Sequence, residues 1–496
     1  MMEIRNISKR FGIFRALHNV SMRVQAGEIN AVVGENGAGK TTLMNILFGL
    51  LPPDAGTILF NGAPVRITSP AVARRMGIGM VHQHFKLAPA LSAMENIILL
   101  AGRGLISGGR RLVAARAAEW QNRLGWRLPL DEPVSRLAIG QRQRVEIIQA
   151  LCAGGKLLIL DEPTASLAPM EVEDLFAALR SLAASGTAVL FISHKLAQVT
   201  EICRRITILR RGDAVYTGEL AGLTHAMLAE KMIGGNVPQA ISRPPPPVGG
   251  EARLALADVT VKREASIVLH HVSLQVHSGQ IVGIAGVEGN GQSALVECIA
   301  DPTLPAAGKM TLSTTRDSAP QRTGRRQLLA IIPEDRRTDG LVPGLSVTAN
   351  MLLKRHHQPP FARWGFLRFS TWRSFTLRRM QEFDIRCPDL DTPVGALSGG
   401  NQQKLVLARE LSDSPEFILA VNPTRGLDIT ATAFVMNQLV RARNAGAAVL
   451  LIHADLDELL AVSDRVAVMY EGQLSDTDWP HTSRESIGRL MLGVRA

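Results

Sequence analysis

Short apolar runs rich in β-branched residues alternate along this chain with longer segments of mixed apolar and polar spacing. The apolar runs predict buried strands, and the mixed segments predict helices, for example over 170–184 and 430–444. Strands that alternate with helices indicate parallel sheets with covered faces, so we expect an α/β fold. The predicted strands are Ile29–Val33, Leu157–Leu160 and Val189–Ile192, followed by Ile281–Ala285, Phe417–Ala420 and Val449–Ile452.

The alternation of predicted strands and helices occurs in two similar copies along the chain. ALHNVSMRVQAGEINAVVGENGAGKTTL (16–43) aligns without a gap on VLHHVSLQVHSGQIVGIAGVEGNGQSAL (268–295), which indicates a duplicated domain. Between the copies lies ISRPPPPVGG (241–250), whose consecutive prolines favour an extended conformation and cannot continue a helix or a central strand. The expected organisation is a first domain over 1–237, a Pro-rich linker over 238–250 and a second domain over 251–496.

Composition narrows the class of protein. A hydrophobic content of 46% with few aromatics suits an ordinary globular α/β protein. The four cysteines are widely spaced without a C-x-x-C pair, which favours a reducing cytosol over disulfides or a zinc site. We expect neither a signal peptide nor a membrane span, because no apolar run approaches the ~20 residues that a bilayer requires. The net charge of +11 favours anionic partners, or it reflects arginines scattered over the surface.

One basic segment, 354–380, interleaves six aromatic residues with arginines. It could form an interface with a membrane protein or with anionic headgroups. It could also stack the bases of single-stranded nucleic acid. The third interpretation is an amphipathic helix pair that packs its rings inward, which we favour for the rings, while we favour the interface for the arginines.

The first copy contains a complete phosphate-binding loop. GENGAGKT (34–41) matches the pattern G-x-x-x-x-G-K-[ST] and lies between a predicted strand and a predicted helix. Its backbone N–H groups would surround a phosphate, Lys40 would reach the β- and γ-phosphates, and Thr41 would coordinate Mg²⁺. The residues predicted to bind the nucleotide here are Gly34, Glu35, Asn36, Gly37, Ala38, Gly39, Lys40, Thr41 and Thr42.

Acidic and polar residues follow other strands of the first copy. In LLILDEP (157–163), Asp161 is a candidate Mg²⁺ ligand and Glu162 a candidate general base for the attacking water. His194, after VLFIS, could bind the γ-phosphate, and Gln83 could contact both Mg²⁺ and the water. The histidines on either side of Gln83 look like a metal pair, but no third ligand is apparent.

In this order, these residues resemble the ATP-binding cassette family. The resemblance covers nearly the whole chain and is most specific at LSGGNQQK (397–404), the family's signature motif. It implies two tandem P-loop ATPase domains, each with a mixed sheet core and an inserted helical subdomain, roughly at 96–136 and 346–396. The tandem arrangement resembles the ATPase subunits of bacterial sugar importers, and the segments 80–97 and 285–293 look closer to the branch linked to nucleoside uptake.

The resemblance also implies a site shared between the two domains. In the family, two cassettes pair head to tail, and each ATP lies between the phosphate loop of one and the signature motif of the other. Phe11 would then stack on adenine, with Ser398, Gly399 and Gly400 approaching the γ-phosphate from the other domain. The implied cofactors are ATP and Mg²⁺.

The two copies depart from the family pattern differently. The first keeps its loop but has Ala138 in place of the signature serine and Ala168 in place of a later aspartate that the second keeps as Asp428. The second keeps its signature but loses the residues that bind and cleave ATP. We therefore hypothesise one hydrolytic site and one degenerate site. The departures of the second copy are Arg263 for the aromatic, Gln292 for the lysine, Glu334 for the glutamine, Val421 and Asn422 for the Asp–Glu pair, and Ala454 for the histidine.

The leading hypothesis for function is the ATP-hydrolysing subunit of an importer of nucleosides or simple sugars. Its expected partners are integral membrane permease subunits and an extracytoplasmic substrate-binding protein, and its expected place is the cytoplasmic side of the membrane, as a peripheral subunit. No nucleic acid is expected. The alternative is a double-cassette ATPase that acts on ribosomes or nucleic acid, which would account for the positive charge.

Overall fold

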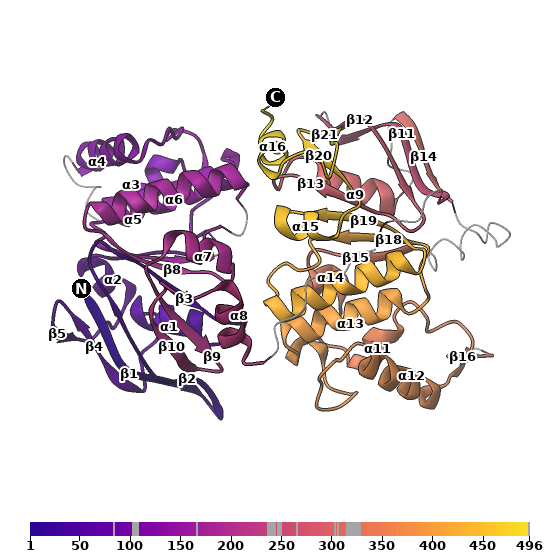
Figure 1. The fold of residues 1–496 in the computed structure, drawn as a ribbon, viewed down its shortest axis with the longest axis horizontal. Helices are drawn as coiled ribbons and strands as arrows, with labels where there is room; N and C mark the ends of the chain where they lie inside the picture. Colours follow the sequence, from indigo (N-terminus) through magenta and orange to yellow (C-terminus); the bar gives the residue numbers. More distant parts are fainter. Residues whose placement is uncertain are drawn as a thin grey trace. The chain divides into compact units, whose positions relative to one another are not determined.

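The computed structural model describes residues 1–82, 85–101, 109–164, 167–235, 245, 250–263, 266–301, 304, 307–313, 329–364 and 366–494. The chain divides into two compact units, Met1–Pro238 and Gln239–Ala496, which we call the first half and the second half (Figure 1). Each half is described by itself. The candidate Gln83 and most of the Pro-rich segment lie outside the described residues.

In the described residues of the first half, ten strands form one mixed sheet. They are β1 (Met2–Phe11), β2 (Phe14–Val24), β3 (Ile29–Val33), β4 (Ala55–Phe60), β5 (Ala63–Val65), β6 (Ile78–Val81), β7 (Leu157–Asp161), β8 (Ala188–Ile192), β9 (Arg205–Arg210) and β10 (Asp213–Glu219). Their order across the sheet is β5-β4-β1-β2-β10-β9-β3-β8-β7-β6. The strands from β9 to β6 are parallel, whereas β1, β2, β4 and β5 pair antiparallel.

The parallel strands carry the core. Every residue of β3, β7 and β8 is buried, as expected for central parallel strands with helices on both faces. The predictions of strands at these three places are confirmed, with β7 and β8 each one residue longer than predicted. Because the carboxyl ends of parallel strands meet at one edge, the residues that follow β3, β7 and β8 lie close together.

Helices surround this sheet, and two of them form the insertion that the sequence predicts. The helices of the first half are α1 (Lys40–Leu47), α2 (Pro70–Arg75), α3 (Ala93–Ala101), α4 (Gly109–Leu124), α5 (Ile139–Cys152), α6 (Pro169–Ala184), α7 (Leu196–Ile202) and α8 (His225–Ile233), with a 3₁₀ turn at Val134–Arg136. Helices α3 and α4 pack on α5, away from the strands (Figure 1). A backbone bridge between Ser92 and Pro133 closes the base of the insertion.

The described strands of the second half form separate sheets. Apart from a short two-stranded hairpin described below, they are β11 (Ala252–Arg263), β12 (Ser266–His277), β13 (Ile281–Ala285), β14 (Ala307–Leu312), β15 (Leu329–Ile332), β18 (Phe417–Val421), β19 (Ala448–His453), β20 (Arg465–Tyr470) and β21 (Gln473–Asp476). One sheet is antiparallel in the order β12-β11-β14, and a six-stranded sheet has the order β15-β18-β19-β13-β20-β21. The three predicted strands at β13, β18 and β19 are confirmed, and all their residues are buried.

The helices of the second half repeat the scheme of the first. They are α9 (Gln292–Ala300), α11 (Val347–Leu352), α12 (Phe369–Glu382), α13 (Gly399–Leu411), α14 (Ile429–Asn444), α15 (Leu456–Val462) and α16 (Arg484–Leu490), with a π-helical turn at Arg336–Gly340 and a 3₁₀ turn at Val394–Ala396. Helices α11 and α12 pack on α13, and a bridge between Ser346 and Pro393 closes this insertion as well. The predicted helices over 170–184 and 430–444 are confirmed as α6 and α14.

The prediction of a helix pair over 354–380 is wrong for its first part. Only α12 is helical, and before it the chain forms turns and a short hairpin of β16 (Ala362–Arg363) and β17 (Phe366–Leu367). The adjacent prolines Pro359 and Pro360 explain the difference, because proline cannot continue a helix. Among the described residues, no helix is both long and apolar enough to span a bilayer.

Candidate active site

The loop after β3 in the first half has the backbone of a phosphate cradle. Gly37 and Gly39 have φ values of 80° and 106°, in the left-handed region that favours glycine. A Cβ atom at Gly39 would lie 2.6 Å from the carbonyl oxygen of Ala16, so no larger residue fits there. The loop leads into the N-terminus of α1, where unpaired backbone N–H groups and the helix dipole favour an anion.

Lys40 is buried at the start of α1 and folds back over this loop. Its Nζ donates hydrogen bonds to the carbonyl oxygens of Gly34 and Glu35, at 2.7 and 3.0 Å. The ammonium group is therefore already held above the loop, where a phosphate would compete for it. Of the other predicted loop residues, Ala38 is buried, whereas Asn36 and Thr41 are exposed.

Asp161 and Glu162 lie at the end of β7, which β8 separates from β3, the strand that carries the loop. Glu162 has a φ of 50°, and its backbone N–H donates to the carbonyl oxygen of Ile192 on β8 at 3.0 Å. A glutamate in the left-handed region is strained, and such strain concentrates at functional sites. The turn separates the two carboxylates, with Asp161 as the last residue of the strand and Glu162 beyond it.

Glu162 pairs with His194. Nδ1 of the histidine lies 2.9 Å from the Glu162 carboxylate, and the Glu162 side chain is only 10% exposed. The two residues come from the ends of β7 and β8, which are neighbours in the sheet. The predicted base and the predicted γ-phosphate ligand are thus in direct contact, an arrangement that can orient a water and accept its proton.

Burial strongly affects the Asp161 carboxylate. Burial, and next the nearby charge of Glu162, raise the pKa of Asp161 to about 6, against the opposing effect of Lys40. A carboxylate held this way gains from a cation, so the side chain fits a Mg²⁺ ligand. Within the described part of the chain, no group of three or more His, Cys, Asp or Glu side chains is arranged to hold a metal ion by itself. Proteins usually hold Mg²⁺ by one or two carboxylates together with phosphate and water.

For the remaining predicted residues that it describes, the structure gives the position in the fold but no contact that indicates a role. Phe11 ends β1 and is 46% exposed, so its ring is available for stacking. Thr42 lies in the first turn of α1. The roles of Gln83, Phe11, Thr41 and Thr42 stay predictions.

Sequence reasoning missed Glu146, a buried residue of α5. Its Oε1 accepts from the backbone N–H of Lys86 at 2.5 Å, while Oε2 has no hydrogen-bond partner among the described residues. Burial raises the pKa of Glu146 to about 7, although hydrogen bonds from the backbones of Lys86 and His82 oppose the shift. The carboxylate borders a cavity of about 130 Å³ together with His82 and Lys86. The one sequence feature that could have predicted its burial is its position among the apolar residues of α5.

The corresponding loop of the second half keeps the backbone and loses the charge. Gly289 and Gly291 have φ values of 99° and 108°, close to those of the first loop. At the lysine position, Gln292 donates from Nε2 to the carbonyl oxygen of Val287 at 2.9 Å, within the loop itself. Nothing cationic at position 292 is therefore available for a phosphate.

The strand ends of the second half are filled by internal contacts. Asn422 has a φ of 40° like Glu162, but its Oδ1 accepts from the backbone N–H of Ala454 at 2.8 Å. Arg425 forms an ion pair with Glu334 and lies 4.0 Å from Glu288 in the loop. Arg263, at the position of the stacking aromatic, pairs with Glu297. The guanidinium groups of Arg425 and Arg263 thus pair with carboxylates of the same half.

The signature segments begin two comparable helices. Ser398 caps α13, since its Oγ accepts from the backbone N–H of Asn401 at 3.4 Å, and Gly399 and Gly400 form the first turn. In the first half, Ala138 occupies the cap of α5 and has no side-chain acceptor. Near Gly399, a Cβ atom would lie 2.6 Å from a guanidinium nitrogen of Arg336. The placement of Ser398, Gly399 and Gly400 against the first loop stays a prediction, because each half is described by itself.

Comparisons with known proteins show which family this chain belongs to. The ABC transporter domain profile matches residues 17–165 and 269–425, so it covers both halves. The nucleoside import ATP-binding protein NupA of Lactococcus lactis is 39% identical, over 98% of this chain and 97% of its own. The guanosine import ATP-binding protein NupO of Bacillus subtilis is 38% identical, over 99% and 97%. The glucose import ATP-binding protein TsgD13 of Haloferax volcanii is 38% identical, over 99% and 96%.

A solved structure matches the fold over the full chain. The archaeal ribosome recycling factor aABCE1, solved with the ribosomal stalk protein aP1, aligns with 99% of this chain and 92% of its own. The TM-score is 0.64 and the sequence identity is 18%. At that identity the likeness extends to the fold alone.

Proposed function

Because this chain belongs to the ABC transporter family, whose ATP-binding domains are ATPases, we propose that it is the ATP-hydrolysing subunit of a nucleoside or sugar importer. The observation that carries the proposal is the set formed by Lys40, Asp161 and the Glu162–His194 pair around a phosphate cradle. Relatives named for nucleoside, guanosine and glucose import match over nearly their full length, which supports the importer assignment.

The mechanism follows from the residues of the first half. The cradle and Lys40 hold the β- and γ-phosphates of ATP and neutralise part of their charge. Bound Mg²⁺ would supply further positive charge to the phosphates, with Asp161 and Thr41 holding it and Gln83 as a third predicted ligand. Glu162 accepts a proton as the water oxygen attacks the γ-phosphorus and the bond to the leaving β-phosphate oxygen breaks. His194 fixes the Glu162 carboxylate and can donate to the γ-phosphate.

We assign hydrolysis to one composite site. The loop of the first half would bind ATP together with Ser398, Gly399 and Gly400 of the second half, in an intramolecular cassette dimer. The opposite site would join the loop that carries Gln292 to the helix capped by Ala138. That site lacks the lysine, both carboxylates and the histidine, so it would bind MgATP weakly and not hydrolyse it.

The proposed partners are membrane permease subunits that respond to closure of the two halves, and a separate extracytoplasmic substrate-binding protein. The chain would act as a peripheral subunit at the cytoplasmic face of the membrane. Two of the three relatives described above are named for nucleoside or guanosine import, so nucleosides are the first cargo to test.

The test is uptake of labelled nucleosides and labelled monosaccharides in cells of the source organism that lack this chain. The strain is complemented with the wild-type chain, with Glu162→Gln, or with Asn422→Ser as the matched change in the second half. We expect wild type and Asn422→Ser to restore nucleoside uptake and Glu162→Gln to fail. Restoration of monosaccharide uptake alone would change the cargo, and unchanged uptake of both classes in the deleted strain would refute the importer function.

A further inference from the structure

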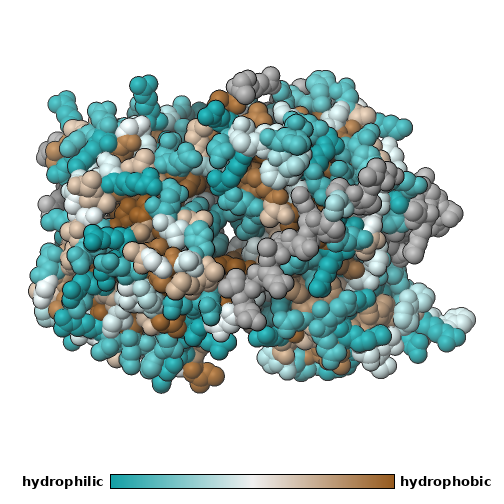
Figure 2. All heavy atoms as spheres, in the orientation of Figure 1, coloured by the Kyte–Doolittle hydropathy of each residue, from teal (hydrophilic) through white to brown (hydrophobic). Residues whose placement is uncertain are grey.

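The hairpin of β16 and β17 presents aromatic rings to solvent. Trp364, Phe366 and Phe369 are 86%, 79% and 66% exposed, although large rings normally lie inside. The hairpin projects away from α12 in Figure 1, and the surface over it stands out from the second half in Figure 2. We call Arg363, Trp364, Phe366, Leu367, Arg368 and Phe369 the hairpin tip.

The base of the hairpin is firmly packed. Phe361 and Trp372 are buried, the Trp372 indole N–H donates to the carbonyl oxygen of Phe361 at 3.0 Å, and Phe375 packs edge-on against Phe361. Three of the six rings of the segment are thus used for folding. Of the other three, Phe369 begins α12 and its ring centroid lies 5.5 Å from that of Trp372, while Trp364 and Phe366 are exposed.

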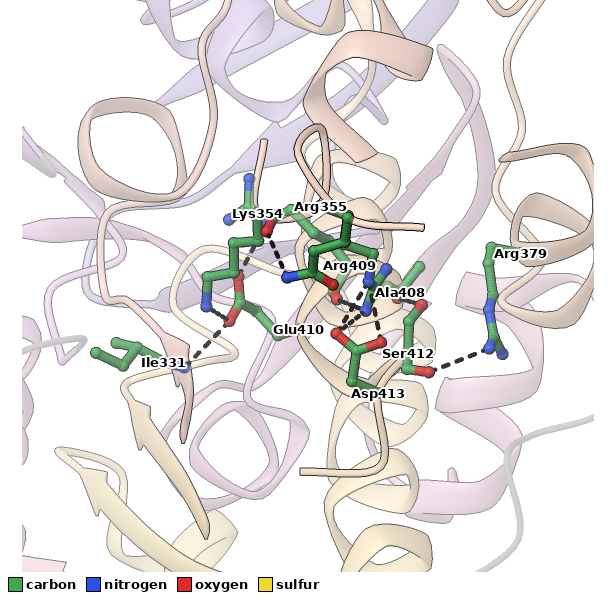
Figure 3. A network of polar contacts seen from close by, with 10 residues as sticks. Ile331, Lys354, Arg355, Arg379, Ala408, Arg409, Glu410, Ser412 and Asp413 are labelled. Carbon is green, nitrogen blue, oxygen red and sulfur yellow. Dashed lines mark hydrogen bonds and ion pairs between the residues drawn. The ribbon is translucent and has the colours of Figure 1, made fainter. Parts of the chain in front are cut away.

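The basic residues of the segment 354–380 also differ between the base of the hairpin and its tip. No aspartate or glutamate occurs between Gly340 and Gln381, although the stretch contains seven lysines and arginines. At the base, Arg355 pairs with Asp413 at 2.6 Å and Lys354 pairs with Glu410 of α13 (Figure 3). Arg379 also donates to the carbonyl oxygen of Ser412 there.

The arginines of the tip are different. Arg363 and Arg368 are exposed and form no ion pair within the described part of the chain. Along the chain they flank Trp364 and Phe366, in a segment that contains no acidic side chain to neutralise them. The hairpin tip therefore combines exposed rings with two exposed arginines, whereas the base of the hairpin is attached to α13 and the residues after it by ion pairs.

The geometry of the tip distinguishes between partners. Successive residues of a strand point to opposite faces, yet Phe366 and Leu367 of β17 are both exposed, at 79% and 41%. A protein partner would cover one face of the ribbon. A lipid surface surrounds an inserted tip on every side, and tryptophan with flanking arginines is typical of the membrane interface.

We propose that the hairpin tip inserts into the headgroup region of an anionic membrane, with Trp364, Phe366 and Phe369 at the acyl boundary and Arg363 and Arg368 on the lipid phosphates. Acidic phospholipids attract juxtamembrane arginines, and each basic residue near such a surface strengthens binding roughly fivefold. The tip would give this half of the chain a lipid contact of its own.

The first test is flotation of the purified full-length protein with vesicles of phosphatidylcholine alone or mixed with phosphatidylglycerol. We expect binding to the mixed vesicles only. The triple change Trp364→Ala, Phe366→Ala and Phe369→Ala should weaken it at least roughly tenfold, since each buried ring contributes favourably. Arg363→Gln and Arg368→Gln should each weaken it roughly fivefold. The matched control, Arg111→Gln with Leu112→Ala, alters an exposed arginine and an exposed leucine of α4 and should bind like wild type.

Trp364 provides a second, local readout. Its fluorescence should shift to the blue and resist iodide quenching when mixed vesicles are added, and Trp364→Phe should abolish both effects. All variants should keep the wild-type rate of ATP hydrolysis, because the tip lies outside the catalytic set, and their melting temperatures should change little, because the three rings are mostly exposed.

Three results would overturn the proposal. Equal vesicle binding by the triple variant would assign the effect to the overall charge of +11. Protection of Trp364 by a single-stranded oligonucleotide but not by vesicles would make the tip a nucleic-acid contact. Normal flotation of the triple variant with loss of recovery on cell membranes would make it a protein-docking element.

Discussion

The two phosphate loops of this chain share a backbone and differ in chemistry. Gly39 and Gly291 have φ values of 106° and 108°, and the turns at Glu162 and Asn422 have values of 50° and 40°. In both halves the turn residue donates its N–H to the neighbouring strand, at 3.0 and 2.8 Å. The backbone of the cradle is therefore set by glycines and strand pairing, and it survives when the reactive side chains change.

The second half also shows what replaces a catalytic set. Where Glu162 meets His194, Asn422 bonds to a backbone N–H instead, and Gln292 closes on its own loop. Arg425 and Glu334 add an ion pair between two segments that lie far apart in the sequence. In the second half, the residues at the matching positions therefore form internal contacts where the first half has the proposed catalytic groups.

The largest expected effect separates the two turns. Removing a general base typically lowers a rate by about 10²–10⁴-fold, so Glu162→Gln should reduce ATP hydrolysis by that factor. Asn422→Ser in the second half should change the rate less than about twofold, since Asn422 has no group that can accept the proton of a water. Steady-state phosphate release measures both. Comparable losses in the two variants would show that the halves share the chemistry.

A second comparison concerns Glu146, since Val406 stands at the matching position of LSGGNQQKLV. The pKa of Glu146 is raised to about 7, so its contribution to stability is complete below its ordinary value and is lost as pH rises through 7. Glu146→Gln keeps an acceptor for Lys86 and does not titrate. We expect little change at pH 5 and stabilisation of up to about 3 kcal/mol at pH 8.5, from 1.36 kcal/mol per pKa unit.

Denaturant unfolding of both proteins across this pH range measures the difference. Glu146→Asp serves as the control, because it keeps the carboxyl and should keep the pH dependence. If Glu146→Gln follows the wild-type pH profile, the carboxylate is not the titrating group.

How much the sequence predicts differs between these features. The strands, the loops and the order of motifs were predicted, because apolar runs and glycine spacing act locally and because the chain repeats itself. The pairing of Arg425 with Glu334 and the burial of Glu146 were not, since both depend on segments far apart in the chain.

The aromatic segment shows the same limit. Six rings in one stretch suggest a single role, yet Phe361 and Trp372 pack inside while Trp364 and Phe366 are exposed. Only the position of Pro359 and Pro360, and of the hairpin after them, decides which rings can reach the core. Spacing along the sequence does not contain that information.

A third comparison concerns the charge at the loops. Hydrogen bonds to charged groups are worth roughly 1.5–3 kcal/mol, so Lys40→Ala should weaken ATP binding about 10- to 100-fold. Gln292→Ala should leave total ATP binding unchanged. Equilibrium binding of a fluorescent ATP analogue to the full chain measures both. An equal loss from Gln292→Ala would reveal nucleotide in the second half and contradict the degenerate assignment.

The smallest effect tests the reverse asymmetry, in which the first half lacks what the second retains. Ala138 and Ser398 hold the same N-cap conformation, with φ and ψ of −60° and 156° against −63° and 153°. The side chain of Gln141 already accepts from the Ala138 N–H at 3.0 Å, so one half of a capping box is present. Ala138→Ser should complete it and stabilise the first half by about 0.5–2 kcal/mol, while Ser398→Ala should destabilise the second by a similar amount.

Thermal unfolding followed by calorimetry checks this pair, with Ala138→Gly as the control that changes the cap without adding a hydroxyl. Because Ala138 is exposed and already extended, the serine needs no rearrangement to reach the N–H of Gln141. An unchanged or lower melting temperature for Ala138→Ser would mean that the missing serine hydroxyl does not limit the stability of the first half. The loss of the serine would then reflect chemistry at the signature alone, and ATP hydrolysis by Ala138→Ser would become the deciding measurement.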